Sequence, residues 1–396
     1  MFTLLLALAT ISLLLWVVLT FFRGDFWQVQ RFNADLEPSK PPAVWPRVLA
    51  IVPARNEAAT ISRVVECLLK QNYTGEYRVI VVDDHSEDQT AALAQSAAVS
   101  VEAADSFDIV SSALLPSGWT GKLWAMQQGV ETGANFSPDY FWFTDADITH
   151  ASDTLERLIA RAEKEHLDLT SLMVLLRAKS FSEQLLIPPF LYFFLKLYPP
   201  HWIASRRAKT AGAAGGCVLL KKTALARIGG VATIKSEVID DCALARAVKN
   251  SGGSLWMGLT RNSISLRAYS SFSEIRDLIA RTAFTQLGYS PLLLLGTLLG
   301  MLLTYLAPVL FSFSSQAVLW RLGLAAWALM TITYLPTVRF YGLSPLWAAT
   351  LPLAAVFYSY ATWVSALRYW LGRGGQWKGR SQAPSKQIGD CRRGSS

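Results

Sequence analysis

The sequence predicts an α/β domain with a mostly parallel sheet, flanked at both ends by helices that cross a membrane. Two observations support this prediction. Between residues 47 and 285, short continuous apolar runs alternate with segments of helical apolar spacing, which is typical of parallel strands covered by helices on both faces. Outside this region lie long stretches without a charged residue, at 2–22, 282–320, 322–338 and 340–367. A spanning helix needs about 20 mostly apolar residues, so both ends of the chain are expected to enter a bilayer.

Residues 2–22 are expected to be a retained membrane anchor. A signal peptide is the alternative, but the segment lacks a positive n-region and no small-residue cleavage site follows it. Residues 23–46 are expected to link this anchor to the domain, and the proline-rich part from 35 to 46 should not be helical.

The domain is expected to occupy residues 47–285. Its expected strands are 48–52, 77–82, 140–144 and 167–176, and the small-residue segment 211–220 should run as a loop into a further strand. Its expected helices are 58–70, 89–98, 122–132, 153–166 and 242–249. Ligands of parallel sheets bind at the carboxyl ends of the strands, so the polar residues that follow the first three strands are expected to share one site.

The segment 185–203 is apolar and aromatic and contains two Pro-Pro pairs. It is too interrupted for a span and suits a helix that lies in the membrane interface. A helix in the core of the domain is the alternative.

Residues 286–371 are expected to form a C-terminal membrane region, and residues 372–396 a basic tail. The net charge of +8 is concentrated near the predicted membrane borders and in this tail. Basic residues beside spans usually face anionic headgroups on the cytoplasmic side, whereas no recognition fold for a nucleic acid accompanies the tail. Three full spans after a cytoplasmic domain would place the tail outside, against this tendency. Either residues 343–367 do not fully cross, or the tail is an exception.

Asp145 and Asp147 follow the predicted strand 140–144 and are candidate metal ligands. Carboxylates two residues apart on an extended segment point the same way, so both can face one cation. Hard oxygen ligands suit Mg²⁺ or Mn²⁺, which bridge phosphate oxygens while they keep several waters. The alternative is a loop whose aspartates cap the helix that begins near residue 153.

Two further acidic pairs are Asp83-Asp84 and Asp240-Asp241. The first follows a strand and can accept a hydrogen bond from a base N–H or a ribose hydroxyl, or else form a capping turn. The second begins a helix, where the helix dipole favours carboxylates. Alternatively, one member of the second pair is a general base whose pKa the like-charged neighbour helps to set.

Lys122 and Arg55 are candidate partners for a diphosphate, and solvated surface cations are the alternative. The four cysteines and four histidines show no spacing typical of a disulfide framework or a metal site.

Five motifs stand in a fixed order along the domain, at 53–57, 82–88, 121–122, 145–147 and 239–241. Together they resemble the motif set of the inverting family 2 glycosyltransferases, whose shared domain binds nucleotide-diphospho-sugars in the GT-A fold. The resemblance extends over residues 47–285. The membrane layout further resembles the hopene-associated glycosyltransferases, a lipid-modifying branch of that family. Its points of likeness are the segments 172–177, 185–200, 211–217 and 281–287.

The resemblance implies a role for each motif. The nucleotide-sugar site would comprise Pro53, Arg55, Glu57, Asp83, Asp84, Lys122, Asp145, Arg281 and Gln286. Asp147, helped by Asp145, would coordinate Mg²⁺ or Mn²⁺ on the donor diphosphate. Asp241 would be the catalytic base, with Asp240 beside it.

One departure from the family pattern bears on the product. Many membrane members carry Gln-x-x-Arg-Trp before their C-terminal spans, and this chain does not, although Arg281 and Gln286 lie in the comparable region. The missing motif favours a single sugar transfer to a lipid, with a hopanoid as the candidate acceptor and a UDP-sugar as the expected donor. The domain is expected on the cytoplasmic face of the inner membrane. A processive polysaccharide synthase and a non-catalytic membrane scaffold or transporter are the alternatives.

Overall fold

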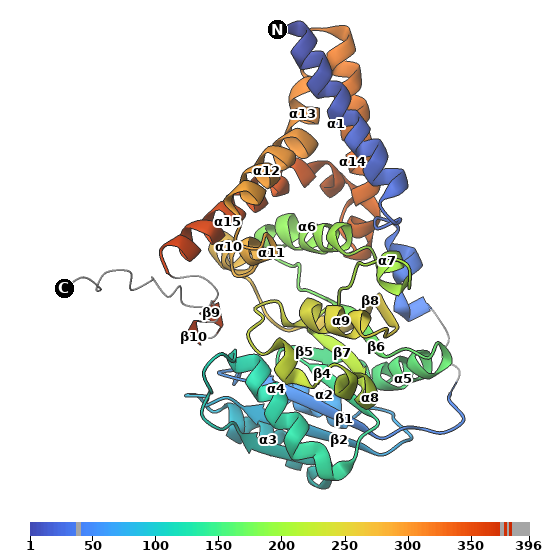
Figure 1. Cartoon of the computed structure of the whole chain (residues 1–396), viewed down its shortest axis with the longest axis vertical. Coiled ribbons are helices and arrows are strands. Elements are labelled where there is room, and N and C mark those ends of the chain that lie inside the picture. The colour runs from blue at the N-terminus through green and yellow to red at the C-terminus, as the bar shows by residue number, and fades with distance from the viewer. Residues whose placement is uncertain (37–40, 373–375, 378–379, 382–396) are drawn as a thin grey trace, which may run out of the picture.

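A computed structural model describes residues 1–36, 41–372, 376–377 and 380–381 of the chain. Figure 1 shows a sheet covered by helices in its lower part and long helices that rise from it towards the N-terminus at the top. The predicted basic tail falls almost entirely outside the described residues, as does part of the predicted linker.

The start of the linker differs from the prediction, because Asp35 ends up inside the short 3-10 helix Ala34–Leu36. This turn precedes the first proline of the segment, so nothing in the backbone prevents it. The Asp35 carboxylate accepts hydrogen bonds from Thr260 Oγ1 at 2.6 Å and from the backbone N–H of Arg261 at 2.7 Å. The linker is thereby fixed to the edge of the sheet domain.

The lower part is built on an eight-stranded mixed sheet. Its strands are β1 (Val48–Ala54), β2 (Tyr77–Asp83), β3 (Phe107–Ser111), β4 (Tyr140–Thr144), β5 (Ile148–His150), β6 (Leu169–Leu175), β7 (Cys217–Lys221) and β8 (Leu255–Ser265). They lie in the order β3-β2-β1-β4-β7-β6-β8-β5.

The predicted parallel arrangement occurs in the first half of this order and again between β6 and β8, whereas β7 and β5 make the sheet mixed. Strands β3, β2, β1 and β4 are parallel, and so are β6 and β8. Strand β7 runs antiparallel to β4 and β6, and β5 runs antiparallel to β8. The reason lies in the register, since Cys217 at the start of β7 pairs with Thr144 at the end of β4. The chain therefore enters β7 from the carboxyl end of β4.

Helices cover both faces of the sheet. They include α2 (Ile61–Leu69), α3 (Thr90–Ser100), α4 (Gly121–Thr132), α5 (Thr154–Lys164), α8 (Lys222–Arg227) and α9 (Asp240–Asn250). Leu49 and Ile51 of β1 belong to the apolar cluster of α4 and α9, whereas Val48, Ala50 and Val52 belong to that of α2, α3 and α5. This alternation is the period of a strand buried on both faces, where each large aliphatic side chain contributes about 1.5–3 kcal/mol.

Every predicted helix and strand of the domain occurs, with shifted boundaries, but three strands are absent from the sequence prediction. Strands β3 and β5 are short. In the longer β8, Arg261, Asn262 and Ile264 are exposed, so no continuous apolar run marks this strand in the sequence.

Helix α6 (Phe181–Leu197) is unbroken although Pro188 and Pro189 stand inside it. A capping box of Ser180 and Glu183 begins the helix, and the buried Glu183 carboxylate also accepts from the backbone N–H of Tyr269 at 2.8 Å. Figure 1 places α6 between the sheet domain and the long helices, and most of its side chains are buried. Packing on both sides offsets the cost of the interior prolines. The short helix α7 (Pro200–Ala204) follows it.

In the part of the chain that the structure describes, four helical segments are long and apolar enough to cross a membrane, namely Phe2–Phe22, Pro291–Ser312, Ala317–Phe340 and Pro345–Trp370. The first is α1 and the third is α14. The second joins α12 (Pro291–Met301) and α13 (Ala307–Ser312) through a π-helical turn, and the fourth joins a 3-10 turn to α15 (Leu351–Trp370). Helices α10 (Phe272–Ala280) and α11 (Ala283–Gln286) connect the sheet domain to α12.

Candidate active site

A cavity of about 1050 Å³ opens where the carboxyl ends of β1 and β4 meet α6 and α10. Eight of the predicted site residues line it: Pro53, Glu57, Lys122, Asp145, Asp147, Asp240, Asp241 and Arg281. The other four, Arg55, Asp83, Asp84 and Gln286, do not line it. The cavity thus brings two of the three acidic motifs together, from the end of β4 and the start of α9.

Lys122 joins these two motifs. It follows the first residue of α4, whose N-cap Thr120 accepts a hydrogen bond from the backbone N–H of Leu123. The Lys122 Nζ atom lies 2.8 Å from Asp145 Oδ1 and 3.0 Å from Asp240 Oδ2. Burial by itself would lower the pKa of Lys122, but the two carboxylates raise it above its ordinary value. The ammonium group therefore stays charged and holds the two acidic motifs next to each other.

Asp241 is oriented by backbone N–H groups. Its Oδ2 accepts from Gly215 at 2.8 Å and its Oδ1 from Cys242 at 2.7 Å. A Cβ atom at position 215 would lie 3.3 Å from both Asp241 Oδ2 and Lys122 Nζ, so glycine allows this close approach of the small-residue loop. Burial and the neighbouring charge of Asp240 raise the pKa of Asp241 to about 6. A carboxylate with a pKa near the working pH is suited to accept a proton.

Asp145 and Asp147 enter the cavity from the turn after β4. Burial, followed by the charges of Asp145 and Glu57, raises the pKa of Asp147 to about 6. This pocket therefore holds more negative charge than its own cations compensate. Within the described ranges, no group of three or more His, Cys, Asp or Glu side chains forms a metal cage. Two carboxylates still fit Mg²⁺ or Mn²⁺, because these ions keep waters and take further ligands from phosphates.

The loops after β1 and β2 are fastened to each other beside the cavity. The buried Arg55 donates from Nη1 to the carbonyl oxygens of Asp84 at 2.5 Å and His85 at 2.9 Å. The backbone N–H of Asn56 donates to Ser86 Oγ at 3.0 Å. The Arg55 guanidinium thus shapes the loop that carries the first acidic motif.

Asp83 has an unsatisfied acceptor in this loop. Its side chain is 8% exposed, and its Oδ1 atom is buried without a hydrogen-bond partner. Its Oδ2 atom accepts from the backbone N–H of Ser86 at 3.3 Å. A buried acceptor without a partner costs about 1–3 kcal/mol, so a ligand that donates a hydrogen bond there would be stabilised.

Four lining residues were missed by sequence reasoning, and one of them, Arg267, lies on the Asp147 side of the cavity, where its charge acts on that carboxylate. Arg267 follows β8, Arg368 lies near the end of α15, and Phe190 and Phe194 project from α6. The two phenylalanines stand four residues apart in a segment predicted to be helical, a signal for a shared face. Arg267 and Arg368 belong to no motif, so only the fold could bring them here.

Gln286 lies apart from these residues on α11, where its Oε1 atom accepts a hydrogen bond from the Tyr198 hydroxyl at 2.9 Å. Its expected contact with the nucleotide sugar stays a prediction.

Residues 49–229 match the model of a family described as glycosyl transferase family 2. The match begins in β1 and ends after α8, so it includes Lys122, Asp145 and Asp147 but not Asp240 and Asp241. A comparison with curated proteins found no match.

One solved glycosyltransferase has a similar fold over most of this chain. A mannosyltransferase from Pyrobaculum calidifontis, solved in complex with GDP-Man and Mn²⁺, is 17% identical, with a TM-score of 0.52 over 90% of this chain and 99% of its own. A glucosyl-3-phosphoglycerate synthase from Mycobacterium tuberculosis, solved with Mg²⁺ and uridine diphosphate, is 18% identical, with a TM-score of 0.39 over 61% of this chain and 80% of its own. The predicted fold class is confirmed as GT-A, with a mixed sheet and apolar helices at both ends.

Proposed function

We propose that this chain, with a family 2 glycosyl transferase domain in a GT-A fold, is a membrane-bound inverting glycosyltransferase that acts on a lipid. The observation that carries the proposal is the composition of the cavity. One end, called the donor end, holds Lys122 and five carboxylates, those of Glu57, Asp145, Asp147, Asp240 and Asp241. The other, called the acceptor end, is lined by α6, α10 and α15, with the apolar Phe190, Phe194 and Leu278 beside the charged Glu274, Asp277 and Arg368. The first end suits a metal-bound diphosphate, and the second suits an apolar acceptor that approaches from a membrane.

Asp241 is the proposed catalytic base. Its carboxylate takes the proton from an acceptor hydroxyl, and the acceptor oxygen forms a bond to the anomeric carbon of the sugar. The bond from that carbon to the diphosphate breaks, and the electron pair leaves with the nucleoside diphosphate. Two backbone hydrogen bonds, from Gly215 and Cys242, fix the orientation of the Asp241 carboxylate in the cavity. This fixed orientation supports a role as general base over helix capping alone. A single backside attack inverts the configuration of the anomeric carbon.

The departing diphosphate needs positive charge around it. Asp145 and Asp147 would hold Mg²⁺ or Mn²⁺, and the bound ion would supply charge stabilisation for the leaving group. Lys122 is proposed to exchange its contact with Asp145 for a phosphate oxygen when the donor binds. Arg267 and Arg281, on the cavity wall, add two further positive charges to the same space.

Asp83 is the proposed contact for the base of the nucleotide, because its Oδ1 atom is a buried acceptor without a partner. The imide N–H of uracil is a donor of the required kind, which supports a UDP-sugar as the donor. Arg55 would act indirectly, by holding the loop in shape.

A hopanoid is the proposed acceptor, on the strength of the membrane layout alone. The sheet domain is proposed to face the cytoplasm from the inner membrane, because nucleotide sugars are made in the cytoplasm.

The test is a screen of nucleotide sugars in which nucleoside diphosphate release is measured with membrane lipid extract, with and without Mg²⁺ or Mn²⁺. We expect release to require both lipid and metal and to yield one glycosylated lipid. Release without any metal dependence would contradict the assignment of Asp147. A long polymer product would favour a processive synthase instead.

A further inference from the structure

Helix α15 stays close to the sheet domain at its beginning. In the turn before it, the ring of Trp347 lies 5.6 Å from that of Phe181, the first residue of α6. About three turns further on, the Tyr358 hydroxyl donates to the carbonyl oxygen of Leu186 at 2.8 Å. The first half of α15 therefore runs along α6.

The second half of α15 runs along α10 and α11. Ser365 Oγ donates to the carbonyl oxygen of Ala280 at 2.5 Å and accepts from the backbone N–H of Phe284 at 3.0 Å. One turn later, Arg368 pairs with Asp277 at 2.6 Å. Helix α10 also carries Glu274 and Arg276, and ionised side chains of this kind are excluded from the hydrocarbon core of a membrane. A helix fastened along α10 over this length cannot cross the same membrane.

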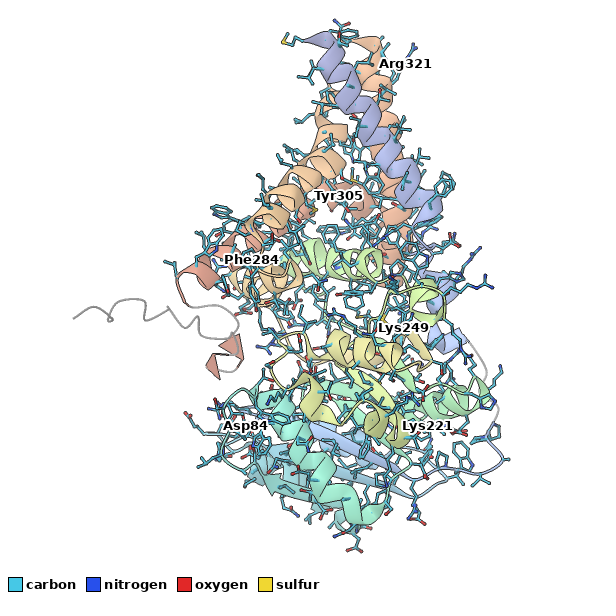
Figure 2. The ribbon with its side chains drawn as sticks, viewed as in Figure 1. Asp84, Lys221, Lys249, Phe284, Tyr305 and Arg321 are labelled. Atoms are coloured by element: carbon cyan, nitrogen blue, oxygen red, sulfur yellow. The ribbon has the colours of Figure 1, made fainter. Side chains whose placement is uncertain are left out.

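The other apolar helices extend further from the sheet domain, although the end of α14 also packs on α6, where the Tyr192 hydroxyl lies 2.9 Å from Thr333 Oγ1. In Figure 2, Arg321 near the start of α14 lies at the top, far from Phe284 at the level of α10 and α11. Figure 1 shows α1 and α13 rising to the same upper end. In the most apolar window, 17% of Phe2–Phe22 and of Pro291–Ser312 is buried, against 33% for Ala317–Phe340 and 44% for Pro345–Trp370. The fourth segment is thus the most enclosed by protein.

The outer face of α15 is apolar and aromatic along its whole length. Its exposed side chains recur at steps of three and four residues and are 37–63% exposed: Leu353, Val356, Tyr360, Trp363, Leu367 and Trp370. The opposite face, with Ala354, Ala361 and Ser365, is buried against the domain. A helix with one side packed on protein and a stripe of Trp, Tyr and Leu on the other is suited to the headgroup boundary of a bilayer.

We propose that α15 lies in the headgroup layer, so that the chain crosses the membrane three times, through α1, α12–α13 and α14. The tail then emerges on the same side as the sheet domain, in agreement with its basic charge. Arg368 and Leu371 at the end of α15 also line the cavity, so its opening lies at the membrane surface. This topology does not depend on the proposed reaction.

The test is sided thiol labelling of the full chain with a membrane-impermeant maleimide, applied to intact cells and to inside-out vesicles. Cys391 is the reporter for the tail. Cys217 and Cys242 are buried, and burial raises the pKa of Cys67 to about 11, so these three thiols react slowly. Two matched reporters, Ser96→Cys in α3 and Ser315→Cys between α13 and α14, are each made in a Cys391→Ser background.

We expect Cys391 and the residue-96 reporter to be labelled from one side, and the residue-315 reporter from the other. Labelling of Cys391 on the same side as the residue-315 reporter would overturn the proposal.

A second measurement uses charge insertion. Val356→Lys and Ile332→Lys place a lysine on exposed faces of α15 and α14, at 51% and 54% exposure. We expect Ile332→Lys to reduce the membrane-inserted protein by roughly tenfold and Val356→Lys to leave it nearly unchanged. Equal loss in both variants would mean that α15 crosses the bilayer.

Discussion

The two ends of the cavity are built in different ways. At the proposed donor end, Lys122 lies 2.8 Å from Asp145 and 3.0 Å from Asp240, and Asp241 accepts two backbone hydrogen bonds. At the proposed acceptor end, the lining comes from three helices far apart in the sequence, and apolar side chains such as Phe190 and Phe194 stand beside the charged Glu274, Asp277 and Arg368. Under the proposed function, the comparison implies that the sheet domain positions the reacting groups, whereas the packing of α6, α10 and α15 shapes the space for the acceptor.

The sharpest way to break this comparison is Asp241→Asn. The variant keeps the shape of the side chain but removes the base, so transfer should fall by about 10²–10⁴-fold while donor affinity changes little. Transfer is followed with saturating donor and metal, and donor affinity by calorimetry. Asp108→Asn, on the exposed edge strand β3, is the control. If Asp241→Asn retained transfer activity, Asp241 would not be the catalytic base.

Lys122→Met tests whether the two acidic motifs depend on one cation. Without the ammonium, donor binding should weaken about tenfold or more, since a charge-assisted hydrogen bond to the diphosphate is lost. Affinity for Mn²⁺ in the absence of donor should rise, because Asp145 is no longer paired with Lys122. Calorimetry measures both quantities, with the exposed Lys222→Met as control. Weaker metal binding by Lys122→Met would show that the lysine does not compete for Asp145.

The donor end should also set the pH dependence of transfer. A base must be deprotonated to act, so at saturating donor and metal the rate should fall as the pH drops below about 6, the pKa of Asp241. Asp240→Asn removes the like charge that raises this pKa, so the acid limb should move to lower pH. The test is to measure the transfer rate against pH for both proteins. An acid limb that moves to higher pH in Asp240→Asn would show that the Asp240 charge does not raise the pKa of Asp241.

The smallest expected effect lies at the acceptor end. Phe194→Ala removes an aromatic wall from the cavity, so KM for the lipid should rise about fivefold, equivalent to about 1 kcal/mol, while donor affinity stays constant. Leu197→Ala, on the exposed end of the same helix, is the control. A change in donor affinity alone would mean that Phe194 contacts the donor and not the lipid.

Sequence reasoning reached the donor end because its residues stand directly after apolar runs. The positions of Asp83, Asp145 and Lys122 follow from strand ends and a helix start, and the structure puts them near where those elements predict. The sequence did not predict that Asp145 and Asp240 lie close together. They do so because β7 runs antiparallel and the loop at Gly215 brings the start of α9 beside β4. Long-range register of this kind leaves no local pattern in a sequence.

The residues at the proposed acceptor end could not be predicted from the sequence for a different reason. Arg368 lies in a helix that looks like a fourth span by length and composition. Hydrophobicity alone does not distinguish a helix that crosses a bilayer from one that lies on it. The difference lies in the contacts of α15 with α6 and α10, which only the folded chain shows.

The most direct test of the central claim is the anomeric configuration of the sugar in the product. The lipid product made from a nucleotide sugar of known configuration is purified, and its anomeric proton coupling is measured by NMR. One displacement with Asp241 as base predicts a configuration opposite to that of the donor. A product with the configuration of the donor would contradict the account, because it requires a mechanism other than one backside attack.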